Sequence, residues 1–237
     1  MIETMSRYDP SHDAYHGRLI LPLPDCYVIY QCSDAVQRVR KTALQLARTY
    51  APSTEISRKP DLLTVEIAAL LHDVLDKKYV SAEQATDPYA FFLPFFTSAA
   101  KAGGVDLIAD GRARSITRII ENVSWSTEKK LRQAGLIEDW HRTCVELHCV
   151  QDADRLDAIG AFGIMRCAAY STVTNHPLHT PSDDPAHASS SIQHFHDKLL
   201  HIREQLKTSA GKALAEKQHQ LMVDFLAAVE AEYNVEG

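Results

Sequence analysis

The sequence predicts an all-α protein, and three observations support this class. Apolar residues recur at helical spacing through most of the 237-residue chain. Strand-like alternation is nearly absent outside Tyr27–Tyr30. The chain contains only 9 glycines and 10 prolines, which excludes collagen-like and broadly disordered proteins. With 45% hydrophobic residues it can bury a sizeable core, so we expect a single domain over residues 1–237.

Apolar periodicity and capping residues delimit the expected helices. These helices span residues 34–50, 62–75, 112–123, 138–170, 192–206 and 210–233. Asp34 and Asp61 are candidate N-terminal caps of the first two. Residues 138–170 form the longest apolar stretch and are interpreted as one buried helix or two abutting helices. Residues 87–96 are also apolar, but Pro88 and Pro94 interrupt them.

Residues 171–190 are rich in proline, serine, threonine and aspartate, so we expect a mobile loop there. The five cysteines include no CxxC pair, which favours reduced thiols in a protein core.

Charge and hydropathy exclude several classes of protein. The net charge of −6 and the absence of a basic stripe with interleaved aromatic residues argue against nucleic-acid binding, which needs clustered lysine and arginine. No apolar run approaches the roughly 20 residues that span a bilayer. The N-terminus is polar and has no apolar signal-peptide region. We therefore expect a cytoplasmic protein without a membrane partner; a nuclear location is also compatible with the sequence.

Polar residues within apolar helices mark the candidate site, because a buried charge needs a partner or a metal ion. One group is Leu71-His72-Asp73-Val74-Leu75-Asp76-Lys77-Lys78, at the end of an apolar helix. A second is Gln151-Asp152-Ala153-Asp154-Arg155-Leu156-Asp157, within the longest apolar stretch, and a third is Ser11-His12-Asp13-Ala14-Tyr15-His16. Histidine and aspartate without cysteine favour Mn²⁺, Mg²⁺, Co²⁺ or Fe²⁺ over a structural zinc ion. A solvated helix end is the alternative interpretation of the first group alone.

These motifs resemble the HD-domain metal-dependent phosphohydrolases, in which His16, His72-Asp73 and Asp154 match the order H…HD…D. The resemblance extends to the YedJ-like branch and related bacterial HD-domain nucleotide pyrophosphohydrolases. The matching motifs are S-H-D-x-x-H at 11–16, R-V at 38–39, L-H-D-x-x-D at 71–76, V-Q-D-A-D-R-L-D-A-x-G-A at 150–161, H-F-x-x-K-L-L at 194–200 and T-x-x-G-K-x-L-A at 208–215. They cover nearly the whole chain.

The resemblance implies a compact HD-domain bundle of helices and a role for each matching residue. His16, His72, Asp73 and Asp154 would bind the divalent metal. Asp76 would act as the acid or base, or orient water. Phosphate oxygens would contact the cationic residues Arg38, Lys77 and Lys78. Asp157, one helical turn beyond Asp154, would support it.

The function implied is hydrolysis of a nucleotide or a similar small phosphate ester or anhydride, in which metal-activated water attacks phosphorus. Two reactions remain open: release of pyrophosphate from a nucleoside triphosphate, and phosphomonoester hydrolysis. The alternative is a non-catalytic or impaired module that binds nucleotides for regulation. A homodimer is compatible with the sequence.

One segment departs from the family pattern. In the family, the Arg-Val helix follows the last histidine of S-H-D-x-x-H by about three residues, whereas here residues 17–35 intervene. Deleting this stretch restores the pattern, so we interpret it as an insertion. It is either a translated intron or other gene-model error, or a genuine loop or lid. Sequencing the mature transcript distinguishes these origins, and the insertion makes His16 the least secure ligand.

Overall fold

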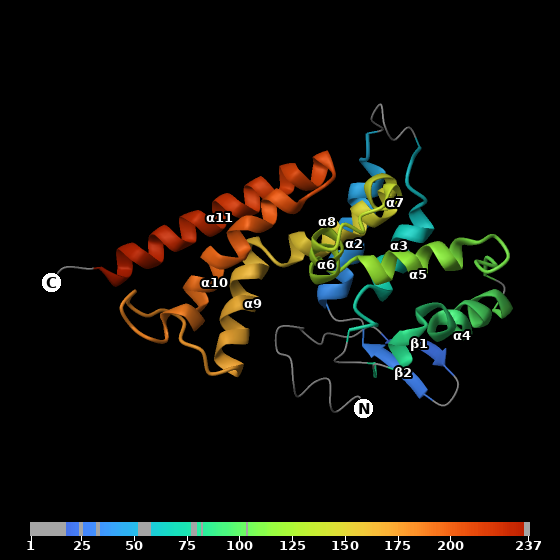
Figure 1. Ribbon diagram of the computed structural model, residues 1–237, viewed down its shortest axis with the longest axis horizontal. Coiled ribbons are helices and arrows are strands. Elements are labelled where there is room, and N and C mark those ends of the chain that lie inside the picture. Colours follow the sequence, from blue (N-terminus) through green and yellow to red (C-terminus); the bar gives the residue numbers. More distant parts are fainter. Residues whose placement is uncertain are drawn as a thin grey trace. The chain divides into compact units, whose positions relative to one another are not determined.

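The computed structural model describes residues 18–23, 26–31, 34–51, 58–76, 80–81, 83–102 and 104–234. The chain divides into two compact units, with the boundary between Gln151 and Asp152. Helices dominate both units, which confirms the all-α class (Figure 1). The prediction of one domain over the whole chain remains untested.

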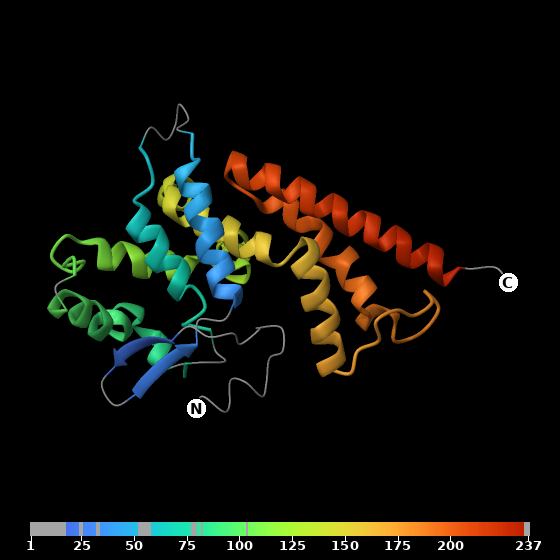
Figure 2. The same cartoon turned by 180° about the vertical axis from the view of Figure 1, so that it is seen from behind.

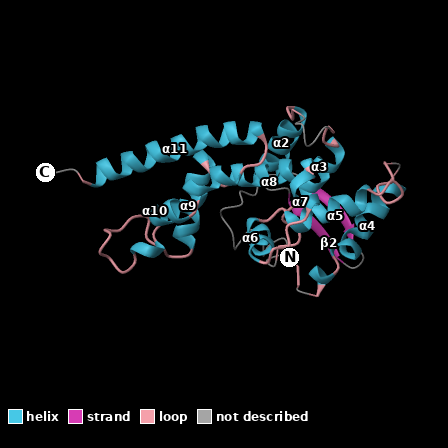
Figure 3. Ribbon diagram, turned by 45° about the horizontal axis from the view of Figure 1, so that its top comes forward, coloured by secondary structure: helices cyan, strands magenta, loops and turns pink. Residues whose placement is uncertain are grey.

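Helices of the unit before Asp152 are preceded by a hairpin. Its elements are β1 (Arg18–Leu23), β2 (Cys26–Gln31), α2 (Asp34–Arg48), α3 (Leu62–Leu71), the 3-10 turn η1 (Gln84–Thr86), α4 (Pro88–Lys101), α5 (Arg112–Asn122), α6 (Trp125–Gln133), α7 (Asp139–Thr143) and the start of α8 (Val145–Asp157). The strands are antiparallel and are the magenta arrows of Figure 3. Strand β1 packs beside α4 (Figure 1). The hairpin lies within the predicted insertion, and β2 contains the alternating residues Tyr27–Tyr30.

Helices α2 and α3 pack side by side (Figure 2). The predicted apolar face of α2 is buried, with Val36 and Val39 no more than 3% exposed. At the start of α3, Oδ1 of Asp61 accepts a hydrogen bond from the backbone N–H of Thr64 at 2.7 Å, which confirms the predicted cap. The helix ends at Leu71, four residues earlier than predicted, and residues 72–75 form turns.

Helix α4 shows that the predicted interruption at Pro94 was wrong. Pro88 occupies the first turn, where its fixed φ is favourable, and Asp87 caps the helix by accepting from the N–H of Ala90 at 2.9 Å. Pro94 lies inside the helix, at a typical cost of about 3 kcal/mol. Phe92 and Phe96 are almost completely buried, and each contributes about 1.5–3 kcal/mol of hydrophobic stabilisation, which offsets that cost.

The described part of the unit that begins at Asp152 contains the end of α8, three further helices and two 3-10 segments. After the end of α8 come α9 (Gly160–Val173), η2 (His187–Ser189), α10 (Ser191–Asp197), η3 (Leu199–Gln205) and α11 (Ser209–Tyr233). Helix α11 packs against α9 and η3. Its predicted bounds were accurate to one residue at the start, where Thr208 caps the helix by accepting from the N–H of Gly211 at 3.0 Å.

Two predicted boundaries in this region were wrong. The stretch 138–170, interpreted as one helix or two abutting helices, contains three: α7 ends before the extended residue Cys144, and α8 ends at Asp157, shortly before Gly160, whose φ of 71° does not continue a helix. The predicted loop at 171–190 begins only after α9 ends at Val173, and it contains η2. Its mobility remains a prediction. Among the described residues, no helix is long and apolar enough to cross a membrane.

Candidate metal centre and the motifs around it

The His72–Asp73 pair lies where α3 ends. The imidazole Nδ1 of His72 is 2.8 Å from the carbonyl oxygen of Ala69. Because a carbonyl only accepts hydrogen bonds, Nδ1 carries the proton in this contact, and the lone pair of a neutral ring is then on Nε2. Nε2 is 3.4 Å from Oδ2 of Asp73. A nitrogen lone pair and a carboxylate oxygen facing each other form a donor pair suited to a divalent cation.

Burial distinguishes the two members of this pair. The side chain of His72 is 4% exposed, whereas that of Asp73 is 36% exposed. The histidine is therefore held by the protein while the carboxylate reaches solvent. Since both fit a mixed nitrogen and oxygen donor set, the residues present are compatible with the implied divalent metal.

The remaining predicted site residues fall in different parts of the chain. Asp76 is exposed, and its backbone N–H donates to the carbonyl of Asp73 at 3.0 Å in the turns after α3. Arg38 is half-buried on α2, which packs on α3. Asp154 is half-buried on α8, in the unit that begins at Asp152. The predicted residues His16, Lys77 and Lys78 lie outside the described residues. Within the described ranges, no three His, Cys, Asp or Glu side chains form a group that could hold a metal ion.

The motif at 150–161 contains several residues that anchor neighbouring segments. Gln151 is 1% exposed and donates from Nε2 to the carbonyl of Asn122 at 2.7 Å and to Oε2 of Glu128 at 3.2 Å. Arg155 donates from Nη1 to the carbonyl of Gln205 at 2.6 Å. The sequence identified this segment as a site for chemistry; the structure shows that part of its polarity is structural.

Asp152 holds the start of α11. Its fully buried carboxylate accepts hydrogen bonds from the backbone N–H of Lys207 at 2.9 Å, and from the N–H and the hydroxyl of Thr208 at 2.7 and 2.8 Å. Burial raises the pKa of Asp152 even though these hydrogen bonds favour its charged form. The contact joins two motifs of the family resemblance, V-Q-D-A-D-R-L-D and T-x-x-G-K-x-L-A. Neither the pairing nor its geometry was predicted.

Asp157 has an unexpected partner. Its Oδ2 accepts a hydrogen bond from Nη1 of Arg166 on α9 at 2.7 Å. The predicted support of Asp154 by Asp157 remains a prediction.

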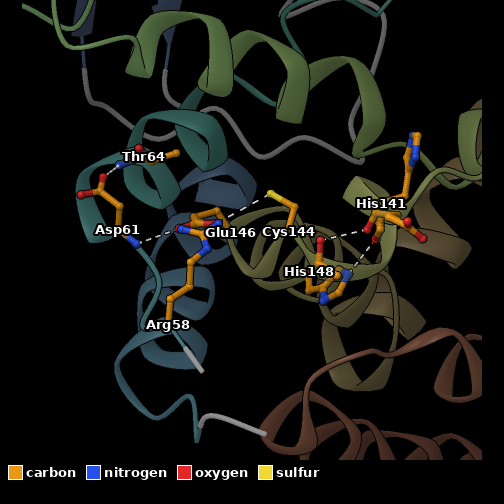
Figure 4. A network of polar contacts seen from close by, with 9 residues as sticks. Arg58, Asp61, Thr64, His141, Cys144, Glu146 and His148 are labelled. Carbon is orange, nitrogen blue, oxygen red and sulfur yellow. Dashed lines mark hydrogen bonds and ion pairs between the residues drawn. The ribbon is translucent and has the colours of Figure 1, made fainter. Parts of the chain in front are cut away.

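A further polar network, missed by the sequence analysis, connects the start of α8 to the start of α3 (Figure 4). The carboxylate of Glu146, whose side chain is 4% exposed, accepts from Nη1 and Nη2 of Arg58 at 2.8 and 2.6 Å. It also accepts from the backbone N–H of Asp61 at 3.0 Å, and the thiol of Cys144 lies 3.7 Å from its Oε2. A glutamate within the longest apolar stretch was the available signal, because a buried carboxylate requires donors.

Comparison with known proteins places these motifs in a family. No family model matches the chain. The uncharacterised Bacillus subtilis protein YpgQ is 32% identical over 177 residues, which cover 73% of this chain and 73% of YpgQ. The chain belongs to the YpgQ family. A crystal structure of YpgQ in complex with ADP superposes with a TM-score of 0.59 at 25% identity, covering 85% of this chain and 88% of YpgQ.

An HD-superfamily hydrolase from Bacillus thuringiensis is also similar in structure. It is 27% identical, with a TM-score of 0.59 and coverage of 86% of both chains. These neighbours confirm the HD-domain fold and support hydrolase activity for the YpgQ family member described here. Assignment to the YedJ-like branch remains a prediction.

Proposed function

We propose that this YpgQ family member is a divalent-metal phosphohydrolase acting on a nucleotide or a similar small phosphate ester or anhydride. The observation that carries the proposal is the buried His72, whose Nδ1–H donates to Ala69 and whose Nε2 faces the Asp73 carboxylate. A backbone partner that fixes the ring in this way is typical of metal-binding histidines. The ADP in the YpgQ crystal structure and the hydrolase among the structural neighbours support the nucleotide and the reaction.

The proposed ligands are His16, His72, Asp73 and Asp154, which would bind Mn²⁺, Mg²⁺, Co²⁺ or Fe²⁺. A bound divalent ion lowers the pKa of water and neutralises negative charge on a phosphate oxygen. His72 contributes a neutral nitrogen in a fixed orientation, so little conformational entropy is lost when it binds. Asp73 contributes negative charge at the solvent-exposed side of the pair.

The other predicted residues act directly on the substrate in this proposal. Asp76 exchanges a proton with the attacking water or the leaving group, a role that typically contributes about 10²–10⁴-fold to the rate. The phosphate oxygens are held by Arg38, Lys77 and Lys78, whose positive charges offset the charge of the transition state. Two lysines in sequence favour a polyphosphate substrate, and therefore release of pyrophosphate over phosphomonoester hydrolysis.

Alanine substitution of the pair tests this function. We expect His72→Ala and Asp73→Ala each to lose bound Mn²⁺, measured by elemental analysis, together with turnover of a nucleotide panel. His148→Ala is the matched control, because His148 is also buried and its Nε2 lies 2.8 Å from a backbone carbonyl, that of His141. Full turnover with retained metal in either variant of the pair would contradict the assignment. The products distinguish the two reactions: pyrophosphate indicates a pyrophosphohydrolase and orthophosphate a phosphomonoesterase.

The same assay tests the alternative of a regulatory module. Mn²⁺ would then raise the melting temperature of the wild-type protein, but no nucleotide in the panel would be hydrolysed. Hydrolysis of a nucleotide would thus indicate a catalytic role of the His72–Asp73 pair, and metal binding without hydrolysis a regulatory one.

A further inference from the structure

The Glu146 network lies at the opposite end of α3 from the His72–Asp73 pair. Asp61, the residue that caps α3, donates its backbone N–H to Glu146. The helix extends from Leu62 to Leu71, about 15 Å, and His72 follows directly. A helix of this length moves as a rigid element, so a shift at its first turn is transmitted to its last.

The buried face of α3 combines large and small side chains. It consists of Thr64, Val65, Ala68, Ala69 and Leu71. Val65 and Leu71 are fully buried and pack well, whereas Ala68 and Ala69 form only shallow ridges, so packing alone sets the register of the helix incompletely. Directional hydrogen bonds must therefore contribute to the register of the helix, a recognised use of buried polar groups.

Three polar contacts join α3 or its cap to other elements. One is an exposed ion pair between Nη1 of Arg112 on α5 and Oδ2 of Asp61, at 3.7 Å. The Nε of Arg40 on α2 donates to Oε1 of Glu66 in the middle of α3 at 2.7 Å, with both side chains about 30% exposed. The third contact is that of Glu146, whose side chain is only 4% exposed, with the backbone N–H of Asp61, the residue that caps α3. A backbone contact sets the position of the helix without the freedom of a second side chain. Glu146 is thus the stronger determinant of register.

We propose that Glu146 is a positioning residue for the metal-binding pair His72–Asp73, acting through the N-terminal end of α3. This rests on the proposed function of that pair. Arg58 neutralises the carboxylate and holds it in place with two hydrogen bonds. The position of α3 therefore depends on the oxygen of Glu146 that accepts from the N–H of Asp61, and not on the charge of Glu146.

Two conservative substitutions separate position from charge. Glu146→Gln keeps an oxygen at the same reach, so we expect Mn²⁺ affinity close to that of the wild type. Glu146→Asp keeps the charge but withdraws the carboxylate by one methylene, so we expect Mn²⁺ to bind about 10-fold more weakly, as for other residues that orient metal ligands. If only the charge of Glu146 or its ion pair mattered, Glu146→Asp would bind Mn²⁺ with nearly wild-type affinity and Glu146→Gln would bind it more weakly.

Removal of the Glu146 carboxylate tests whether weaker metal binding is more than a general loss of stability. Glu146→Met leaves Arg58 without the carboxylate, but the Arg58 side chain is 58% exposed and can be solvated, so the variant is expected to fold at some cost in stability and to bind Mn²⁺ about 10-fold more weakly. The matched control is Glu128→Met. Glu128 and Arg132 have side chains 5% and 59% exposed, against 4% and 58% for Glu146 and Arg58, but Glu128 lies on α6.

Mn²⁺ binding is measured by electron paramagnetic resonance at a temperature where circular dichroism shows every variant folded. Weaker binding by Glu146→Asp, with Glu146→Gln and Glu128→Met close to the wild type, supports the proposal. Wild-type affinity in Glu146→Asp overturns it, even if Glu146→Met fails to fold. His72→Ala is included in the series: if it retains wild-type Mn²⁺ affinity, the proposed function itself is wrong.

Discussion

Replacement of Gly211 by alanine places two opposing effects in direct competition. Gly211 lies in the first turn of α11, and a glycine-to-alanine change in a helix interior typically stabilises by about 1 kcal/mol. However, a Cβ at this position would lie 2.6 Å from Oδ2 of Asp152 and 2.7 Å from Oγ1 of Thr208. Both atoms are buried and hydrogen-bonded to each other, so neither can move without breaking that contact.

The magnitudes predict that the steric effect is larger. Asp152 accepts from three groups, and hydrogen bonds to a charged acceptor contribute about 1.5–3 kcal/mol each. Displacing the carboxylate enough to lose one or two of them costs about 3 kcal/mol. After subtraction of the gain in helix propensity, Gly211→Ala should destabilise the protein by about 2 kcal/mol.

Urea unfolding followed by circular dichroism measures this change. The same substitution in an Asp152→Ala background provides the control, because the closer of the two contacts is then absent and the Thr208 hydroxyl is no longer bonded to a carboxylate. There we expect Gly211→Ala to cost at least about 1 kcal/mol less, which is a coupling between residues in contact. A Gly211→Ala protein as stable as the wild type, or an identical cost in both backgrounds, would refute the reasoning.

Three further predictions concern a thiol, a helix cap and the metal. Burial raises the pKa of Cys144 to about 11, so iodoacetamide should leave it unlabelled in the native protein at neutral pH and label it in urea, as peptide mapping would show. Burial of Asp61 favours its neutral form, but the hydrogen bonds from Thr64 and the charge of Arg112 prevail and lower its pKa. Asp61→Ala should therefore cost about 1 kcal/mol in unfolding free energy at neutral pH, and less as the pH falls through that lowered pKa; an equal cost in strong acid would contradict this. Excess Mn²⁺ at about 100 times its dissociation constant should stabilise the protein by about 2.7 kcal/mol, and EDTA should reverse the shift in melting temperature. Identical melting curves with both additives would count against a metal site.

The sequence predicted those helices whose stability is decided locally. The apolar face of α2 and the capping residue of α3 are visible in the sequence, because periodicity and caps involve residues within a few positions of each other. The sequence could not decide between one helix and two abutting helices around Gly160, because glycine is also tolerated inside helices and only its positive φ shows the break between α8 and α9. At Pro94 the sequence predicted an interruption, but α4 continues, because burial of the neighbouring phenylalanines outweighs the local effect of proline.

The contacts of the site that the sequence did not predict depend mainly on residues far apart in the chain. His72 and Asp73 are adjacent, so their pairing was predictable, whereas the contact between Ala69 and the imidazole requires the backbone geometry at the end of α3. Arg58 and Glu146 are separated by 88 residues, and no sequence pattern matches one charge to the other. Asp152 was recognised as unusual, but its partners at 207 and 208 depend on the packing of α11.

The antiparallel register of the hairpin has a consequence for the evolution and engineering of this chain. Arg18 of β1 is the partner of Gln31 of β2, so the polypeptide leaves and re-enters the hairpin at neighbouring points, about 5 Å apart. A segment with adjoining ends can be gained, lost or exchanged while the flanking chain stays where it was. The hairpin is therefore a suitable site for protein engineering, where a short turn, an epitope or a fluorescent protein can replace the two strands.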